Sequence, residues 1–213
     1  MSVAAVVVAG GRGVRFGGPK QFASLGEESV AAISVRHARS VAQTVILVVP
    51  AGYSGSGEGA DVVTEGGASR AASVRAGLAY VGEADVVVVH DAARPLARPE
   101  LFRAVVAAVR DGADAAVPGL PITDTVKRVR WVQSTCVVED TVAREELVTV
   151  QTPQAFSRVA LQTAHAHDAE ATDDAALIER AGGRVVVVAG QRDNLKITEP
   201  ADLEWARSAG VAS

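Results

Sequence analysis

The sequence contains one cysteine, Cys136, among its 213 residues. A single cysteine excludes an internal disulfide and any metal site built from several cysteines. Long apolar runs are also missing, because no stretch approaches the ~20 residues that a membrane-spanning helix needs. The first residues lack the basic segment that opens a secretory signal peptide. These absences predict a soluble, cytoplasmic protein with no membrane partner.

An excess of positive charge is lacking as well. The chain has 21 Lys and Arg against 25 Asp and Glu, which gives a formal net charge of −4 at pH 7. This balance argues against a broad nucleic-acid surface, so no nucleic-acid partner is expected. Any basic cluster must be local, and local cations in an acidic protein favour a small anionic ligand.

Repeats of fixed period and long linkers are absent, and the length predicts one domain over residues 1–213. Valine-rich runs alternate with helical patterns, which is typical of a doubly wound, Rossmann-like α/β fold. The apolar character of the runs favours a mostly parallel sheet covered on both faces. Expected strands are Ala4–Ala9, Val45–Val49, Asp85–His90, Ala113–Pro118 and Arg184–Ala189. Expected helices are Val30–Ser40, Ser69–Val81, Glu100–Arg110, Arg158–His167, Asp173–Ala181 and Pro200–Ser208. The Gly- and Ser-rich stretch Ala51–Asp61 is expected to be a flexible surface loop.

Residues 121–146 interrupt this alternation. Their mixture of β-forming and polar residues predicts a protruding two-stranded β-arm with a turn near Gln133–Thr135. An isolated hairpin is marginally stable in water. This one has more apolar surface than a solvated hairpin tolerates, contributed by Val126, Val129, Trp131, Val137 and Val138. We therefore expect the arm to pack against a second copy of the chain and form a homodimer.

A glycine-rich, basic loop follows the first expected strand and contains Gly10, Gly11 and Gly13 together with Arg12, Arg15 and Lys20. The glycines can adopt positive φ and let the backbone approach a ligand. Consecutive N–H groups in such a loop can form an anion-binding nest. On the loop alone, a phosphate site and a glycine-rich turn with solvated charges both stay open.

Two familiar phosphate motifs do not fit this loop. Phe16 stands where a dinucleotide fingerprint has its third glycine, which disfavours a dinucleotide-dependent oxidoreductase. Pro19 separates Gly18 from Lys20, whereas a Walker A loop has Gly-Lys followed by Ser or Thr. The loop is therefore of another kind.

Asp91 follows the strand expected at Asp85–His90. Its carboxylate is expected at the carboxyl end of a parallel strand, where open α/β sheets bind their ligands. A carboxylate in that position can hold Mg²⁺ against phosphate oxygens. A helix-capping role for Asp91 is the alternative.

Seven segments, in this order, carry a resemblance that covers nearly the whole chain: AGGRGVRFGGPKQF, GGASRAASVRAGL, HDAARP, DTVKR, TVAREELVTVQTPQAF, ATDDA and DNLKIT. The sequence resembles the sugar-phosphate nucleotidyltransferases, and among them most closely the 2-C-methyl-D-erythritol 4-phosphate cytidylyltransferase family. The resemblance implies transfer of CMP from CTP to a polyol phosphate, 2-C-methyl-D-erythritol 4-phosphate, with release of pyrophosphate. Such a reaction belongs to the non-mevalonate route to isoprenoids.

The resemblance also implies roles for individual residues. Cations at the triphosphate, with a catalytic role, would be Arg15, Lys20 and Lys196. Nucleotide-binding residues would be Gly10, Gly11, Gly13, Gly66, Gly67 and Ser73. Acceptor-binding residues would be Arg94, Thr125, Arg144 and Thr152, with Arg144 reaching the site of the dimer partner. Asp91 would hold Mg²⁺ or another divalent cation, with Asp193 or Asn194 as a candidate second ligand.

Simpler interpretations accompany several of these residues. Lys196 fits a surface lysine at a strand end, Arg144 a solvated charge, and Ser73 a helix serine turned to solvent. Asp173 and Asp174 are interpreted as a favourable helix start. Histidines 37, 90, 165 and 167 are interpreted as core or surface residues, and Cys136 as inert.

Two departures from the family pattern and two alternative functions stay open. Ala68 stands where many relatives carry an acidic residue, so base reading must rely more on the backbone. The segment Phe16–Lys20 is shorter than in many relatives. The alternatives are a ribitol-5-phosphate cytidylyltransferase and a nucleotide-binding module that has lost activity, although the latter would not need Arg15, Lys20, Asp91 and Lys196 together.

Overall fold

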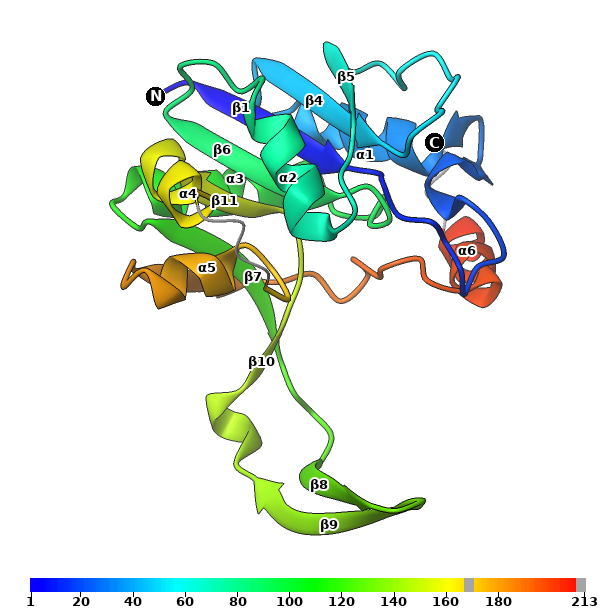
Figure 1. Ribbon diagram of the computed structural model, residues 1–213, viewed down its shortest axis with the longest axis vertical. Helices are drawn as coiled ribbons and strands as arrows, with labels where there is room; N and C mark the ends of the chain where they lie inside the picture. Colours follow the sequence, from blue (N-terminus) through cyan, green and yellow to red (C-terminus); the bar gives the residue numbers. More distant parts are fainter. Residues whose placement is uncertain (167–170, 210–213) are drawn as a thin grey trace.

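The computed structural model describes residues 1–166 and 171–209. Its centre is an eight-stranded sheet (Figure 1). Four neighbouring strands run parallel and occur in the order β6-β1-β4-β5. They are β1 (Val3–Val8), β4 (Thr44–Val49), β5 (Val62–Glu65) and β6 (Val86–Asp91). The alternation of valine runs and helices thus forms the expected, mostly parallel doubly wound sheet.

The other half of the sheet contains both parallel and antiparallel strand pairs. Strand β11 (Gln154–Ser157) is antiparallel to both β6 and β7 (Ala115–Pro121) and lies between them. Strand β10 (Val148–Val150) is also antiparallel to β7, whereas β12 (Val185–Ala189) is parallel to it. Strands β5, β10 and β11 were not expected, because they are short and carry polar residues.

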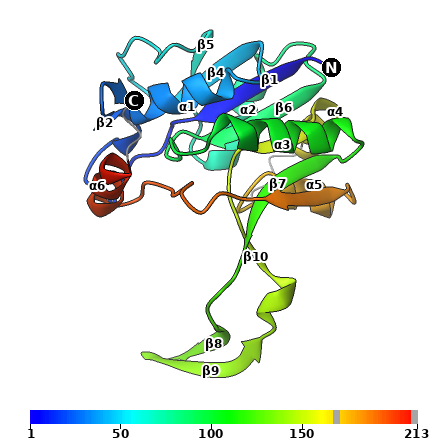
Figure 2. The same ribbon diagram turned by 180° about the vertical axis from the view of Figure 1, so that it is seen from behind.

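Helices cover both faces of the sheet (Figures 1 and 2). On one face, α1 (Val30–Ala38) and α3 (Pro99–Arg110) contribute to one hydrophobic core. On the other face, α2 (Arg70–Leu78), α4 (Arg158–Ala164) and α5 (Ala175–Arg180) contribute to a second core. Helix α6 (Pro200–Ser208) packs beside a small hairpin of β2 (Ser24–Leu25) and β3 (Glu28–Ser29). The six expected helices are therefore present.

Local sequence explains where these helices begin. Ser69 caps α2, because its Oγ accepts a hydrogen bond from the Ala72 N–H at 3.1 Å. The stripe of Val74, Leu78 and Val81 is buried as its spacing predicts. Helix α4 ends at Ala164, short of the expected end at His167, which lies outside the described residues.

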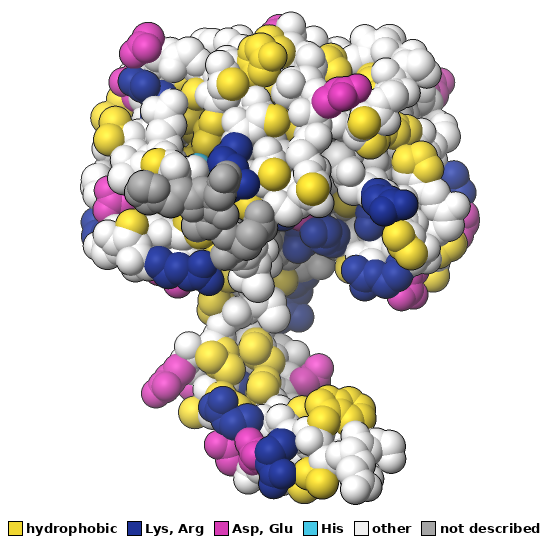
Figure 3. All heavy atoms as spheres, viewed as in Figure 1, with side chains coloured by type: hydrophobic (Ala, Val, Ile, Leu, Met, Phe, Trp, Pro, Cys, Tyr) yellow, Lys and Arg dark blue, Asp and Glu magenta, His cyan; other side chains and the backbone are white. Residues whose placement is uncertain are grey.

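The β-arm is present and projects away from the sheet (Figure 1). Strands β8 (Val126–Val132) and β9 (Thr135–Val142) pair antiparallel and turn at Gln133, whose φ is +54°. A short 3₁₀ turn, η2 (Arg144–Glu146), leads from β9 into β10. The arm carries apolar side chains beside charged ones on its surface (Figure 3), and Trp131 is 69% exposed.

The Ala51–Asp61 stretch is a surface loop, as expected, and Tyr53 anchors it by stacking on Phe22 with ring centroids 4.7 Å apart and by donating a hydrogen bond to Glu58 at 2.8 Å. One expectation about coverage of the sheet needs correction. Strand β12 is not covered on both faces, because it lies at an edge of the sheet with Val187 55% exposed. None of the helices in residues 1–166 and 171–209 is long and apolar enough to cross a membrane.

Candidate active site

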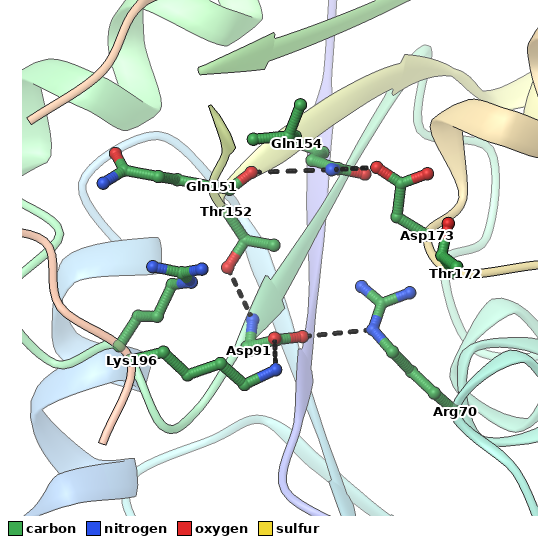
Figure 4. Close-up of a pocket in the computed structure, with 10 residues that line it drawn as sticks. Arg70, Asp91, Gln151, Thr152, Gln154, Thr172, Asp173 and Lys196 are labelled. Atoms are coloured by element: carbon green, nitrogen blue, oxygen red, sulfur yellow. Dashed lines mark hydrogen bonds and ion pairs between the residues drawn. The ribbon is translucent and has the colours of Figure 1, made fainter. Parts of the chain in front are cut away.

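Two adjacent pockets lie at the carboxyl ends of β1 and β6. The glycine-loop pocket, of about 350 Å³, is lined by the loop after β1 and by the start of α2. The Thr152 pocket, of about 270 Å³, is lined by the β10–β11 connection and residues 172–173 (Figure 4). Arg70, Asp91 and Lys196 line both pockets. A ligand that spans the two must therefore pass these three charged side chains.

The glycine loop is shaped by a tight internal turn. Gly13 has a φ of +63°, and a Cβ there would come within 1.7 Å of the Gly18 carbonyl oxygen. Gly10 and Gly11 line the pocket without positive φ, so only Gly13 of the three uses the conformational freedom of glycine. Buried Gln21 holds the start of the loop, because its Nε2 donates to the carbonyl oxygens of Ala9 at 2.6 Å and Gly11 at 2.9 Å.

Five cations line the glycine-loop pocket: Arg12, Arg15, Lys20, Arg70 and Lys196. Lys20 begins the 3₁₀ turn η1 (Lys20–Phe22) after Pro19. Partial burial and repulsion from Lys196 and Arg15 lower the pKa of Lys20 below its usual value. Cations held close enough to repel one another favour an anionic ligand that relieves the repulsion. The expected grouping of Arg15, Lys20 and Lys196 is thus present in the structure.

Asp91 is the last residue of β6 and lies where the two pockets meet. Its side chain is 12% exposed and forms ion pairs with Arg70 (Nε–Oδ1, 3.2 Å) and Lys196 (Nζ–Oδ2, 2.6 Å). Burial alone would raise the pKa of Asp91, but Arg70 and Lys196 outweigh burial and lower it, so the carboxylate stays ionised. The Asp91 side chain therefore pairs with cations rather than capping a helix, and Lys196 is paired with Asp91 rather than being a free surface lysine.

Arg70 is a site residue that the sequence interpretation missed. It is the first residue of α2 and pairs with Asp91 on one side and with Asp174 (Nη1–Oδ2, 2.7 Å) on the other. The side chain of Asp174 is only 1% exposed, so Asp174 is more than a favourable helix start. In the part of the chain that the structure describes, Arg70 Nη2 is buried without a hydrogen-bond partner.

The Thr152 pocket brings two expected acceptor residues together. Arg94 lines it and donates from Nη1 to the Asn194 carbonyl oxygen at 2.8 Å. Thr152 Oγ1 accepts from the Asp91 N–H at 3.0 Å and lies 3.2 Å from His90 Nδ1. His90 is fully buried, and burial lowers its pKa to about 3, so it is neutral. The buried, neutral His90 contacts Thr152 and lines neither pocket among the described residues, which fits the structural role expected for it.

Gln154 and Asp173 complete the far wall of this pocket. Gln154 Nε2 donates to Asp173 Oδ2 at 2.9 Å, as Figure 4 shows. Asp173 also accepts from the Ala176 N–H at 3.0 Å, which agrees with its expected place at a helix start. The sequence interpretation missed Gln154, whose partner lies 19 residues further along the chain.

The segment from Gly66 to Ser73 forms another wall of the glycine-loop pocket. Gly67, Ala68 and Ser73 line the pocket, whereas Gly66 lies behind it. A Cβ on Gly66 would come within 2.6 Å of Ser73 Oγ, which explains why glycine is needed there. Ser73 is buried and donates to the Ser69 carbonyl oxygen at 2.9 Å, so it is not turned to solvent.

Besides Gly13 and Gly66, four predicted residues among those described line neither pocket. Thr125 and Arg144 are on the arm, and among the described residues neither lines one of the two pockets. Arg144 donates to the Thr123 carbonyl oxygen. Asp193 forms a surface ion pair with Arg98, and Asn194 donates to Gln151 and Thr152. Within residues 1–166 and 171–209 no group of three or more His, Cys, Asp and Glu side chains could hold a metal ion.

Comparison with known proteins gives consistent matches over nearly the whole chain. The family model described as 2-C-methyl-D-erythritol 4-phosphate cytidylyltransferase (IspD) matches residues 3–209. An enzyme of that name from Nocardia farcinica is 43% identical over 217 residues, covering 97% of this chain and 93% of the relative. The crystal structure of the cytidylyltransferase of that name from Thermus thermophilus has a TM-score of 0.82 and 34% identity, covering 98% of each chain.

Some similar proteins are longer. A bifunctional IspD/IspF enzyme from Clavibacter michiganensis subsp. michiganensis is 44% identical over 230 residues, covering 98% of this chain. The chain spans only 55% of that relative's length, and 56% of a second bifunctional IspD/IspF enzyme from an Anaeromyxobacter species. The similarity is therefore confined to about half of each bifunctional protein.

Proposed function

The chain belongs to the 2-C-methyl-D-erythritol 4-phosphate cytidylyltransferase family, and we propose that it transfers CMP from CTP to 2-C-methyl-D-erythritol 4-phosphate. The products are 4-diphosphocytidyl-2-C-methyl-D-erythritol and pyrophosphate, in the non-mevalonate route to isoprenoids. The observation that carries this proposal is the pair of pockets that share Arg70, Asp91 and Lys196. Two substrates bound in adjoining pockets can react where the pockets meet.

In this reaction an acceptor phosphate oxygen attacks the α-phosphorus of CTP. A new P–O bond forms, the bond to the bridging α–β oxygen breaks, and pyrophosphate leaves with the bonding electron pair. The acceptor phosphate is already ionised near neutral pH, so the protein needs no strong general base. Its task is to align the reactants and stabilise developing negative charge. Arg15, Lys20 and Lys196 are suited to that task because they surround the glycine-loop pocket.

The two pockets suit different substrates. The glycine-loop pocket has the loop backbone and the cations that a triphosphate needs, and Gly67 and Ser73 can contact the base. The Thr152 pocket has Arg94 for an acceptor phosphate or diol and hydroxyl and amide groups for a polyol. We therefore assign CTP to the first pocket and the polyol phosphate to the second.

Asp91 fits a role as a magnesium ligand. Mg²⁺ usually binds through one or two carboxylates and completes its octahedral shell with substrate phosphates and water. A single ionised carboxylate at the meeting point of the two pockets, as Asp91 provides, satisfies that requirement. When bound, Mg²⁺ or another divalent cation would neutralise charge on the phosphate oxygens.

Exchange of Asp91 for asparagine tests the metal assignment. Asp91→Asn keeps the shape of the side chain but removes the charge that attracts Mg²⁺. We expect the variant to need more Mg²⁺ for half-maximal rate and to turn over more slowly, as measured by pyrophosphate release across a Mg²⁺ titration. Asp111→Asn, an exposed carboxylate after α3, is the control and should match the wild type. Full activity in excess chelator, or an unchanged Mg²⁺ dependence in Asp91→Asn, would contradict the assignment.

The arm supports a homodimer with shared sites. One face of the arm bears the paired residues Val129 and Val138 beside the pair Trp131 and Cys136, and all four are exposed. Such a face is suited to a like-with-like contact across a two-fold axis. Among the described residues Arg144 and Thr125 line neither pocket of their own chain, and we propose that they complete the acceptor site of the partner.

Substrate competition tests the proposed function directly. The protein is incubated with Mg²⁺, one of CTP, UTP or ATP, and a panel of sugar and polyol phosphates, and pyrophosphate is measured. We expect CTP with 2-C-methyl-D-erythritol 4-phosphate to be used most efficiently, because a pocket that hydrogen-bonds the base rejects bases that leave its polar groups unpaired. A preference for ribitol 5-phosphate would identify that compound as the acceptor instead, and equal use of UTP would refute selectivity for cytosine. Absence of turnover with every pair would indicate a nucleotide-binding module.

A further inference from the structure

A chain of buried polar contacts connects helix α4 to the active site. His165, which caps the C-terminus of α4, contacts Asp174 (Nε2–Oδ1, 3.0 Å). Asp174 in turn accepts from Arg70 Nη1 at 2.7 Å, and Arg70 Nε donates to Asp91 Oδ1 at 3.2 Å. The contacts thus run from the end of one helix, through the starts of two others, to the carboxyl end of β6.

The His165–Asp174 end of this series of contacts is closed to substrates. The side chains of His165 and Asp174 are 2% and 1% exposed. Among the described residues His165 lines neither pocket, whereas Arg70 and Asp91 line both. Any influence of His165 on the reaction must therefore pass through Asp174 and Arg70.

The geometry of the contacts fixes the orientation of Arg70. Each carboxylate oxygen of Asp174 has its own partner, Oδ1 at His165 and Oδ2 at Arg70. The carboxylate can therefore not rotate without breaking one of the two contacts. A guanidinium group is planar and rigid, so holding Nη1 at Asp174 also fixes the direction in which Nε points. That direction is toward Asp91.

We propose that His165 is a positioning residue of the cytidylyl transfer, which acts through Asp174 and Arg70 on Asp91. This inference rests on the proposed function. The His165 N–H donates to the Asp174 carboxylate, and Asp174 accepts from Nη1 of Arg70. Arg70 Nε in turn donates to the Asp91 carboxylate between the two substrate pockets.

The chemistry is sensitive to such an arrangement. An in-line transfer requires the acceptor oxygen and the α-phosphorus to be aligned, and small displacements lower the rate more than the affinity. Arg70 and Asp91 border both pockets, so their orientation affects the alignment of both substrates. Loss of the His165 contact should therefore lower kcat while KM for CTP changes little.

Two substitutions at position 165 separate hydrogen bonding from packing. His165→Leu fills a similar volume but cannot donate, and we expect it to lower kcat by about ten-fold, the lower end of the range for partners of this kind. His165→Gln can present an amide N–H near the position of Nε2, and we expect it to keep kcat within about three-fold of the wild type. Equal losses in the two variants would overturn the proposal, because packing would then explain both.

A double-mutant cycle tests the route of the effect. If His165 acts through Arg70, then His165→Leu should cause no further loss of kcat in an Arg70→Ala background. If the two losses multiply, His165 acts independently of Arg70 and the proposal is wrong. Circular dichroism and thermal melts establish that each variant is folded.

A variant of Asp174, the partner of His165, covers the case in which His165→Leu does not fold. Asp174→Asn has almost the same shape as the wild type, but its amide oxygen carries no charge for Arg70, so we expect a similar loss of kcat. Wild-type turnover in Asp174→Asn would overturn the proposal.

The wild-type protein in the same assay separates the inference about His165 from the proposed function. An inactive wild type refutes the proposed function, whereas an active wild type with an unaffected His165→Leu variant overturns only the inference about His165.

Discussion

Replacing Lys20 or Lys196 by alanine is expected to lower kcat by about 100- to 1000-fold, while KM for CTP changes much less. Both lysines line the glycine-loop pocket, and Lys196 also lines the Thr152 pocket. Negative charge on the α-phosphoryl oxygens and on the leaving pyrophosphate grows as the transition state forms. A cation fixed beside those oxygens stabilises the transition state more than the bound substrate, so its loss appears mainly in kcat.

The two lysines reach the pocket from opposite ends of the chain, and each has a reason to be well positioned. Lys20 follows Pro19 at the start of η1, next to Gln21, whose amide holds the loop. Lys196 is fixed by Asp91 at 2.6 Å. Loss of one preorganised donor typically costs roughly 3–4 kcal/mol of transition-state stabilisation, which corresponds to the expected decrease in rate.

Steady-state kinetics with saturating acceptor provide the measurement. Arg103→Ala removes an exposed cation from α3 and should leave kcat unchanged, which controls for the loss of one positive charge. A Lys20→Ala or Lys196→Ala variant that turns over like the wild type would remove that lysine from the catalytic group. A large rise in KM with unchanged kcat would reassign it to substrate binding alone.

The elements that the sequence predicts well are those with strong local signals. The buried strands β1, β4 and β6 are valine runs, and α2 begins at a serine whose side chain caps it. Strand β11 has no such signal, since it is four residues long and contains Gln154 and Ser157. Its place in the sheet depends on pairing with β6 and β7, which are distant in the sequence, so no local pattern could reveal it.

The same distinction applies to the site. The glycine loop, Asp91 and Lys196 occur in recognisable motifs, and the structure brings them to one place. Arg70 also lies in a recognisable motif, but its importance comes from Asp174, which is 104 residues away. His165 appears in the sequence as an ordinary helix histidine, and only its contact with Asp174 connects it to the site. Roles defined by a distant partner require the fold before they can be identified.

Mixing an Arg144→Ala protein with a Lys20→Ala protein is expected to restore activity that neither variant has alone. Lys20 lines a pocket of its own chain. Arg144 belongs to the arm, which projects from the sheet (Figure 1), and among the described residues it lines neither pocket. If Arg144 serves the partner's acceptor site, each mixed dimer has one site with both residues intact. The other site of that dimer lacks both.

The size of the restored activity follows from counting sites. Random mixing of equal amounts makes half of the dimers mixed, and one of the two sites in each is intact, so activity should reach roughly a quarter of the wild-type value. Co-expression or joint refolding of the two variants allows the subunits to exchange, and pyrophosphate release is then measured at constant total protein.

A matched mixture separates true complementation from a general effect of mixing. Lys20 and Lys196 line the same pocket of one chain, so a mixture of Lys20→Ala and Lys196→Ala leaves every site with one lysine missing. That mixture should stay as inactive as its components. If the Arg144→Ala and Lys20→Ala mixture also stays inactive, then Arg144 acts within its own chain and the arm has only a structural role. Sedimentation that reveals a stable, fully active monomer would exclude the shared site, because the acceptor pocket would then be complete without a partner's arm.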